Sequence, residues 1–89
     1  MIIDTRNYLL KYNLKQISLQ PREMKMILLL SDNKMHNIRE IRRYLGLVTD
    51  LGTTIIINKL NQKMKNLAKI KFIMKRDNNY RIYREVYIN

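Results

Sequence analysis

Apolar residues recur at helical spacing in three stretches of the chain. They predict helices over about residues 21–31, 38–45 and 54–66. The apolar faces consist of Met24, Ile27 and Leu28 in the first stretch, of Ile38, Ile41 and Leu45 in the second, and of Ile57, Leu60 and Met64 in the third. The opposite face of the third predicted helix is polar and basic.

The ends of these stretches carry helix-capping signals. Pro21 suits the first helical position, because its missing N–H would have no partner there. Asn37 is a suitable N-cap for the second helix, and Gly46 fits the position just beyond its end. Thr53 or Thr54 is the expected N-cap of the third helix.

The N-terminal segment favours strands. Residues 8–12 and 16–19 are predicted to form two strands around a turn at Asn13, within a strand region over 1–19. A helix with Asp4 as its N-cap is the competing interpretation, because the tyrosines and leucines of this segment also have acceptable helical spacing.

A basic hairpin is predicted over about residues 69–83. Its first strand alternates apolar residues with lysines, which is typical of a half-buried strand. The inward face is expected to consist of Ile70, Phe72 and Met74. Residues 77–79 (Asp-Asn-Asn) can form the turn, because these residue types tolerate positive φ. The tail, residues 84–89, is expected to stay extended and to pair with the N-terminal strand or with a second subunit.

Composition narrows the class of protein. The chain has 89 residues, so we expect one domain over 1–89. Its formal net charge is +11, which favours a polyanionic partner such as nucleic acid, an anionic membrane surface or an acidic protein. No apolar run is long enough to span a bilayer and no secretory signal is evident, so we expect a soluble, cytoplasmic protein without a membrane partner.

Catalytic and metal-binding patterns are missing from the sequence. There is no cysteine, and His36 is the only histidine. We expect His36 to make a turn or phosphate contact, since it has no second ligand to form a transition-metal site. The two glycines cannot build a glycine-rich phosphate loop. We therefore expect no enzyme activity, no metal and no cofactor.

The order of elements resembles the OmpR/PhoB-type winged helix-turn-helix domain. That family typically has Leu-Thr-Pro-x-Glu before its first helix; here Leu19, Pro21 and Glu23 match, and Gln20 replaces the threonine. The sequence Asp-Asn-Asn-Tyr-Arg over residues 77–81 stands where the family's wing usually has Gly-x-Gly-Tyr-Arg. The resemblance covers about residues 7–83 and implies an α+β fold with an N-terminal strand pair, three helices and a C-terminal β-hairpin wing.

The resemblance also implies DNA binding by the third helix and the wing. The expected DNA-binding residues are Thr54, Asn58, Lys59, Asn61, Gln62, Lys63 and Lys65 on the helix, and Lys71, Lys75, Arg76, Asn78, Asn79 and Arg81 in the wing. The helix has no arginine, whereas the family's recognition helices tend to be rich in it. Asn and Gln suit adenine edges, so we expect an AT-rich target with a large contribution from the wing, in the minor groove.

The favoured function is sequence-specific binding of double-stranded DNA by a small transcriptional regulator without a receiver domain, as a homodimer on repeated half-sites. One alternative is an accessory DNA-binding protein of a plasmid or mobile element, acting in a conjugation relaxosome or at an origin. Another is a winged-helix module for protein interaction. It is suggested by the apolar tail over 86–88 and by the isoleucine run 55–57, of which one member cannot face the core.

Overall fold

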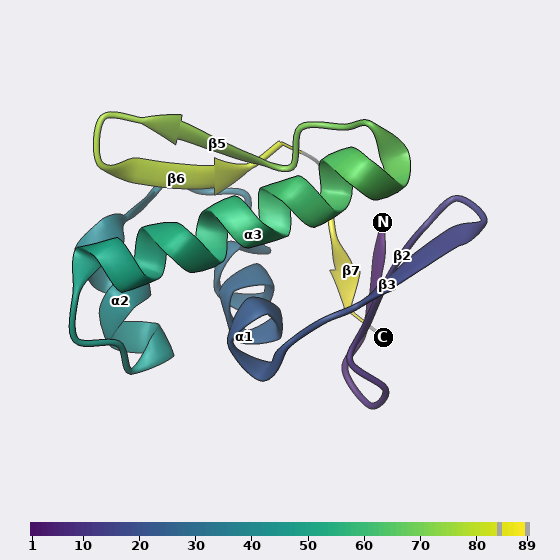
Figure 1. Cartoon of the computed structure of the whole chain (residues 1–89), viewed down its shortest axis with the longest axis horizontal. Coiled ribbons are helices and arrows are strands. Elements are labelled where there is room, and N and C mark those ends of the chain that lie inside the picture. Colours follow the sequence, from purple (N-terminus) through teal and green to yellow (C-terminus); the bar gives the residue numbers. More distant parts are fainter. Residues whose placement is uncertain (84, 89) are drawn as a thin grey trace.

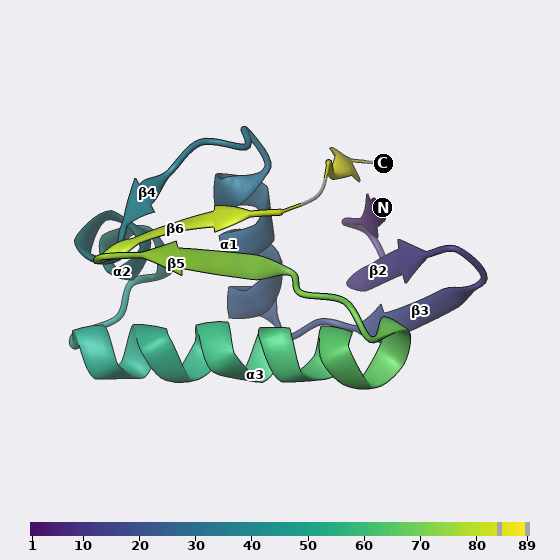
Figure 2. The ribbon, with the colours of Figure 1, turned by 90° about the horizontal axis from the view of Figure 1, so that it is seen from above.

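The computed structural model of the chain describes residues 1–83 and 85–88. Three helices, α1 (Pro21–Leu30), α2 (Ile38–Leu45) and α3 (Asp50–Ala68), combine with two small sheets in the predicted α+β arrangement (Figure 1). The first sheet lies near the C-terminal end of α3. The second lies alongside α3 (Figure 2).

The first sheet has the strand order β3-β2-β1-β7. Its strands are β1 (Ile2–Asp4), β2 (Leu9–Tyr12), β3 (Lys15–Ser18) and β7 (Tyr87–Ile88). The predicted pair around Asn13 is confirmed as β2 and β3, and Asn13 has the positive φ (54°) that the tight turn needs. A third strand, β1, precedes this pair, within the predicted strand region over 1–19.

The competing N-terminal helix is wrong for a local reason. The Asp4 carboxylate accepts hydrogen bonds from the backbone N–H of Arg6 and of Asn7, at 3.0 and 3.1 Å. These bonds close a turn between β1 and β2 instead of starting a helix. The tail was expected to pair with the N-terminal strand or with a second subunit. The first of these is observed, since β7 pairs in parallel with β1. Residues 84 and 89 of the predicted tail lie outside the described residues.

α3 begins four residues earlier than predicted. The N-cap is Thr49, whose side chain accepts a hydrogen bond from the backbone N–H of Gly52 at 3.0 Å. Thr53 and Thr54 are already helical, and each hydroxyl donates to a backbone carbonyl one turn earlier. The expectation that Thr53 or Thr54 is the cap is therefore wrong: Thr53 is buried inside the helix, and Thr49 supplies the capping hydrogen bond. The helix ends at Lys69, which adopts a left-handed conformation (φ 54°).

The hairpin is shorter than predicted and its inward face differs. β5 (Ile73–Arg76) and β6 (Asn79–Ile82) form the antiparallel pair, and β4 (His36–Asn37) adds a third strand beside β6. Phe72 and Ile73 are both buried, whereas Met74 is only half-buried. The predicted alternation failed because residues 69–72 are not part of the strand: they leave α3 through the left-handed Lys69, and the strand starts only at Ile73. Asp77 has the positive φ (57°) at the turn.

The helices bury the faces that their spacing predicted, except that Leu28 of α1 is only half-buried. Ile27, Ile41, Leu60 and Met64 are fully buried in one core, together with residues from both sheets and with Phe72. α2 has the predicted bounds, and α1 ends one residue before the predicted position. None of the helices in the described ranges has the length and hydropathy needed to cross a bilayer.

Candidate nucleic-acid interface

α3 presents one long side to solvent. Figures 1 and 2 show α1 and α2 behind this helix and the β5–β6 hairpin beside it, so that the remaining side is free of other elements. The core takes the inward face, because Ile57, Leu60 and Met64 are buried. The exposed positions along the free side are Leu51, Ile55, Asn58, Lys59, Gln62, Lys65 and Asn66.

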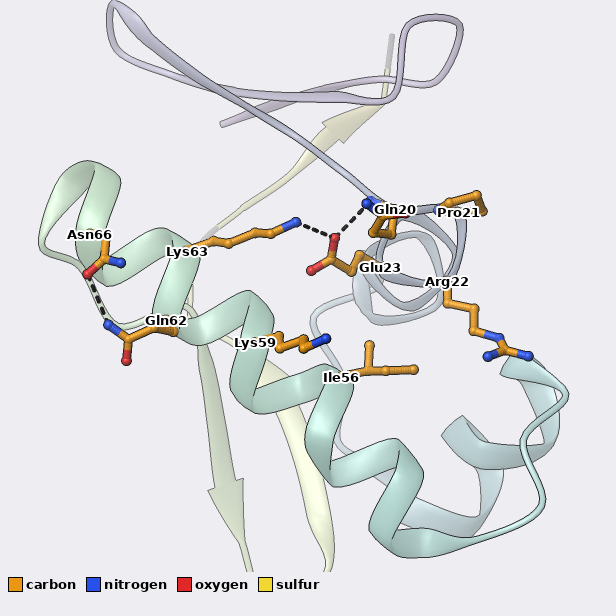
Figure 3. Close-up of a pocket in the computed structure, with 9 residues that line it drawn as sticks. All are labelled: Gln20, Pro21, Arg22, Glu23, Ile56, Lys59, Gln62, Lys63 and Asn66. Atoms are coloured by element: carbon orange, nitrogen blue, oxygen red, sulfur yellow. Dashed lines mark hydrogen bonds and ion pairs between the residues drawn. The ribbon is translucent and has the colours of Figure 1, made fainter.

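Several residues that the sequence predicted as DNA contacts lie on this free side. Asn58, Lys59 and Lys65 are exposed. Gln62 is also exposed and donates a hydrogen bond to the Asn66 side chain at 2.9 Å, which orients both amides along the helix (Figure 3). Thr54 is half-buried and its hydroxyl donates to the backbone carbonyl of Asp50.

Lys63 points away from the free side, toward α1. Its Nζ lies 2.7 Å from Glu23 Oε1 and 3.3 Å from the Ser18 carbonyl oxygen (Figure 3). Glu23 is buried, and the same Oε1 accepts the backbone N–H of Gln20 at 2.8 Å. The geometry gives Lys63 a structural partner inside the protein, which the sequence could not indicate because Glu23 lies 40 residues away.

Asn61 is also occupied within the protein. Its Nδ2 donates to the Ile73 carbonyl oxygen at 3.2 Å, and its Oδ1 accepts the Ile73 N–H at 2.8 Å. The side chain thus binds both backbone groups at the start of β5. This pair of bonds fixes the hairpin against α3 at the place where the chain re-enters the sheet.

Replacing Asn61 with alanine is expected to lower the free energy of unfolding by about 2 kcal/mol, because the partly buried N–H and C=O of Ile73 would lose their partners. Chemical denaturation measures this change. Asn58→Ala, at an exposed position on the same helix, is the matched control and should change stability by less than about 0.5 kcal/mol. Equal stability of the two variants would contradict the assigned role of Asn61.

The wing residues expected to contact DNA lie on or near the surface. Lys71, Lys75, Arg76, Asn78 and Arg81 are exposed, and Asn79 is half-buried. Asn79 Oδ1 and Asn37 Nδ2 lie 3.5 Å apart, across the β4–β6 pair. Lys75 Nζ lies 6.0 Å from the centre of the Tyr80 ring, a cation–π geometry that leaves the ammonium accessible.

A basic groove lies between the C-terminal half of α3 and β5. It has a volume of about 490 Å³, and its lysines are Lys65, Lys69, Lys71 and Lys75. Lys69 was not among the predicted contact residues. Its position in the sequence, directly between the predicted helix and the predicted hairpin, could have identified it. The fold thus gathers cations from two elements around one hollow.

These four lysines have no acidic partner. Among residues 1–83 and 85–88, the carboxylates that form ion pairs do so with His36, Arg42 and Lys63 only. Asp77, at the wing tip, is the one acid in the hairpin. The positive charge of the groove is therefore left for an external anion.

A second hollow, of about 740 Å³, lies between the start of α1 and the middle of α3 (Figure 3). Lys59 extends into the space between the two helices, and Arg22, which the sequence analysis did not single out, lies on the α1 side. Both cations are exposed and border the free side of α3. They extend the positive surface past α3, on the side away from the wing.

His36 lies in the protein interior and contacts Asp32 in the turn after α1, so the expected turn contact is present, whereas the buried ring does not face an external phosphate. It is buried in β4, with Nδ1 2.6 Å from Glu40 Oε1 and Nε2 2.9 Å from Asp32. Burial disfavours the charged ring, but the hydrogen bonds to Asp32 and Glu40 outweigh it and raise the pKa of His36 above its usual 6.5. Through these two contacts His36 links the end of α1 to the start of α2.

This histidine predicts a pH dependence of stability. Because the folded-state pKa is raised, the stabilisation is fully present below the unfolded pKa, near 6.5, and is lost as pH rises through the higher folded value. We expect the free energy of unfolding to fall between pH 6 and pH 8.5, and the fall to be much smaller in His36→Gln. Urea titrations at both pH values measure it; an unchanged pH dependence in the variant would contradict the assignment.

No His, Asp or Glu cluster of metal-binding size occurs in the part of the chain that the structure describes. The chemistry of this surface is that of unpaired ammonium, guanidinium and amide groups. Such groups bind phosphates and base edges through charge and hydrogen bonds.

Comparison with known proteins gives one structural match of high quality. No protein-family model matches the sequence, and no curated protein does. The structure is similar to that of the DNA-binding domain of CadC from E. coli, with a TM-score of 0.75 and 16% sequence identity, over 86% of this chain and 79% of that chain. At this identity the likeness establishes the fold. The chain therefore has the winged-helix fold.

Proposed function

We propose that the chain binds double-stranded DNA sequence-specifically and regulates transcription. In this proposal α3 enters the major groove and the β5–β6 wing reaches an adjacent minor groove. The observation that carries the proposal is the basic groove between these two elements, whose four lysines have no acidic partner among the described residues. The DNA backbone supplies the dense negative charge that such a groove attracts.

The residues on the free side of α3 fall into those that can contact bases and those that can contact phosphates. Asn58 and Gln62 carry amides that can pair with the two hydrogen-bonding groups of adenine in the major groove. Lys59 and Lys65 can reach the phosphates on either side. Thr54, near the start of the helix, supplies a methyl group at the half-buried edge. These assignments favour an AT-rich target.

The wing contributes the remaining contacts in this proposal. Arg76 flanks the turn and suits a narrow minor groove, which attracts arginine through its negative potential. Backbone contacts are proposed for Lys71, Lys75, Asn78, Asn79 and Arg81. Asn61 and Lys63 are left out of the interface, because their polar atoms already bind Ile73 and Glu23.

The arrangement of the first sheet supports the OmpR/PhoB-type subgroup, in which strands precede the first helix. We propose a cytoplasmic homodimer on two half-sites, whose spacing would follow the DNA helical repeat. An accessory role at a plasmid origin or in a relaxosome uses the same interface. The genomic position of the selected site separates the two roles: sites at promoters indicate regulation, and sites at origins indicate the accessory role.

Selection from a pool of random duplexes at two salt concentrations tests the proposal. We expect one AT-rich motif to be enriched and to persist at the higher salt, with repeated half-sites if the protein is a dimer. Variants Asn58→Ala and Lys59→Gln should weaken binding to that motif without changing stability, because both side chains are exposed. Binding without any motif, lost completely as salt rises, would leave an electrostatic attraction alone and would overturn sequence-specific recognition.

A further inference from the structure

Two large aliphatic side chains are exposed on the free side of α3. Leu51 is 70% exposed and Ile55 is 49% exposed. They lie one turn apart, in the same line as Asn58 and Gln62, at positions i, i+4, i+7 and i+11. The structure thus identifies Ile55 as the outward member of the isoleucine run, since Ile57 is buried and Ile56 is half-buried against the α1 side.

The surroundings of this apolar pair are polar and carry more positive than negative charge. Leu51 borders a hollow that it shares with Thr54 and with Arg39, Lys75 and Asn78, from the start of α2 and from the wing. The one acid that lines this hollow is Asp50, and it forms an ion pair with Arg42 at 3.4 Å. On the other side, Ile55 is followed by Asn58 and Lys59 along the exposed face. A surface that is apolar at its centre and cationic on both sides fits a partner whose charged edges flank an apolar strip.

The major groove of DNA offers that combination. Its walls carry phosphates, and its one apolar group is the C5 methyl of thymine. In helix-turn-helix docking, the N-terminal residues of the recognition helix make the base contacts, and Leu51 and Ile55 lie in the first two turns of α3. Aliphatic side chains placed there can discriminate bases only through that methyl group.

We propose that Leu51 and Ile55 read thymine, by packing against its C5 methyl in the major groove. This inference rests on the proposed function and adds to it a specific base preference and the residues that set it. It gives the AT preference a second origin besides the amides: Asn58 reads adenine, and the aliphatic pair reads the thymines of neighbouring base pairs.

Replacement of thymine by deoxyuridine in the selected duplex tests the inference, because deoxyuridine lacks the methyl and keeps the base pairing. Affinity for each singly substituted duplex is measured by fluorescence anisotropy at constant salt. We expect a loss of about fourfold at each contacted thymine, the free energy of one buried methyl. In Ile55→Ala or Leu51→Ala, the loss at the corresponding thymine should disappear, which shows direct coupling between side chain and methyl.

Leu14→Ala is the matched control. Leu14 is fully exposed at the β2–β3 turn, far in sequence from α3, and its replacement should leave the sensitivity to deoxyuridine unchanged. Alanine favours helix at both α3 positions, so the α3 variants should keep their fold, as thermal unfolding verifies.

The outcomes separate this inference from the proposed function. Selection of one motif, with no loss on deoxyuridine substitution or with the same loss in both α3 variants, overturns thymine reading and leaves DNA recognition intact. A protein that binds no duplex, or binds all duplexes equally, overturns both. If the α3 variants bind DNA normally but lose association with a protein, the apolar pair is a protein contact and the inference fails.

Discussion

Binding to duplex DNA is expected to weaken about four-thousandfold when monovalent salt rises from about 50 to about 200 mM. The reason is the number of unpaired cations on the proposed interface. Those on α3, on the wing and in the segment between them are Lys59, Lys65, Lys69, Lys71, Lys75, Arg76 and Arg81. If each neutralises one phosphate, the logarithm of the binding constant should fall with the logarithm of salt at a slope of about −6.

Two triple variants distinguish DNA binding at the proposed interface from attraction by the net charge of the protein. Lys65, Lys71 and Lys75 line the basic groove, and replacing them with glutamine should make the salt slope shallower by about 2.7. The matched control replaces Lys11, Lys25 and Lys34, which are exposed on other elements, and lowers the net charge by the same amount. Equal slopes for the two variants would show that DNA is attracted by net charge alone and would contradict the proposed interface.

Replacing Lys63 with methionine is expected to lower the free energy of unfolding by about 3 kcal/mol, the lower end of the cost of breaking a buried ion pair. The Glu23 side chain is only 4% exposed, and without Lys63 its carboxylate would keep only the Gln20 N–H among the partners described here. We expect the lower end of this energy range because the Lys63 side chain is 35% exposed and the ion pair is only partly buried. Chemical denaturation measures the loss.

Lys59→Met is the control for this substitution, since Lys59 is exposed one turn earlier and forms no ion pair among the described residues. Its stability should stay within about 0.5 kcal/mol of the parent, while its DNA affinity falls. Lys63→Met should show the opposite pattern: reduced stability, with nearly unchanged affinity at a temperature where it is folded. Adding Glu23→Gln to Lys63→Met should recover stability, since it removes the uncompensated buried charge. A Lys63→Met protein that is as stable as the parent but fails to bind DNA would contradict this assignment and would show that Lys63 contacts DNA.

The apolar period and the charge of the sequence determined the three helices and the basic character of α3 and the hairpin, and the winged-helix arrangement was what the resemblance implied. Helical spacing is a local property, so Ile57, Leu60 and Met64 identified the buried face of α3 without any knowledge of its neighbours. The ends of helices and strands were harder to predict from the sequence. Thr53 and Thr54 were the predicted caps of α3 where Thr49 is the actual one, and the predicted alternation around Phe72 began four residues before the true start of β5.

Only the tertiary structure decided which polar residues of α3 are available to an external partner. Asn58, Lys59, Asn61 and Lys63 are of similar type and lie within six residues of each other, yet Asn61 binds the backbone of Ile73 and Lys63 binds Glu23. Those partners lie 12 and 40 residues away, and sequence spacing carries no information about such contacts. The same holds for Ile55: its neighbours Ile56 and Ile57 are chemically identical, and the packing of α3 against α1 and the core alone leaves Ile55 facing outward.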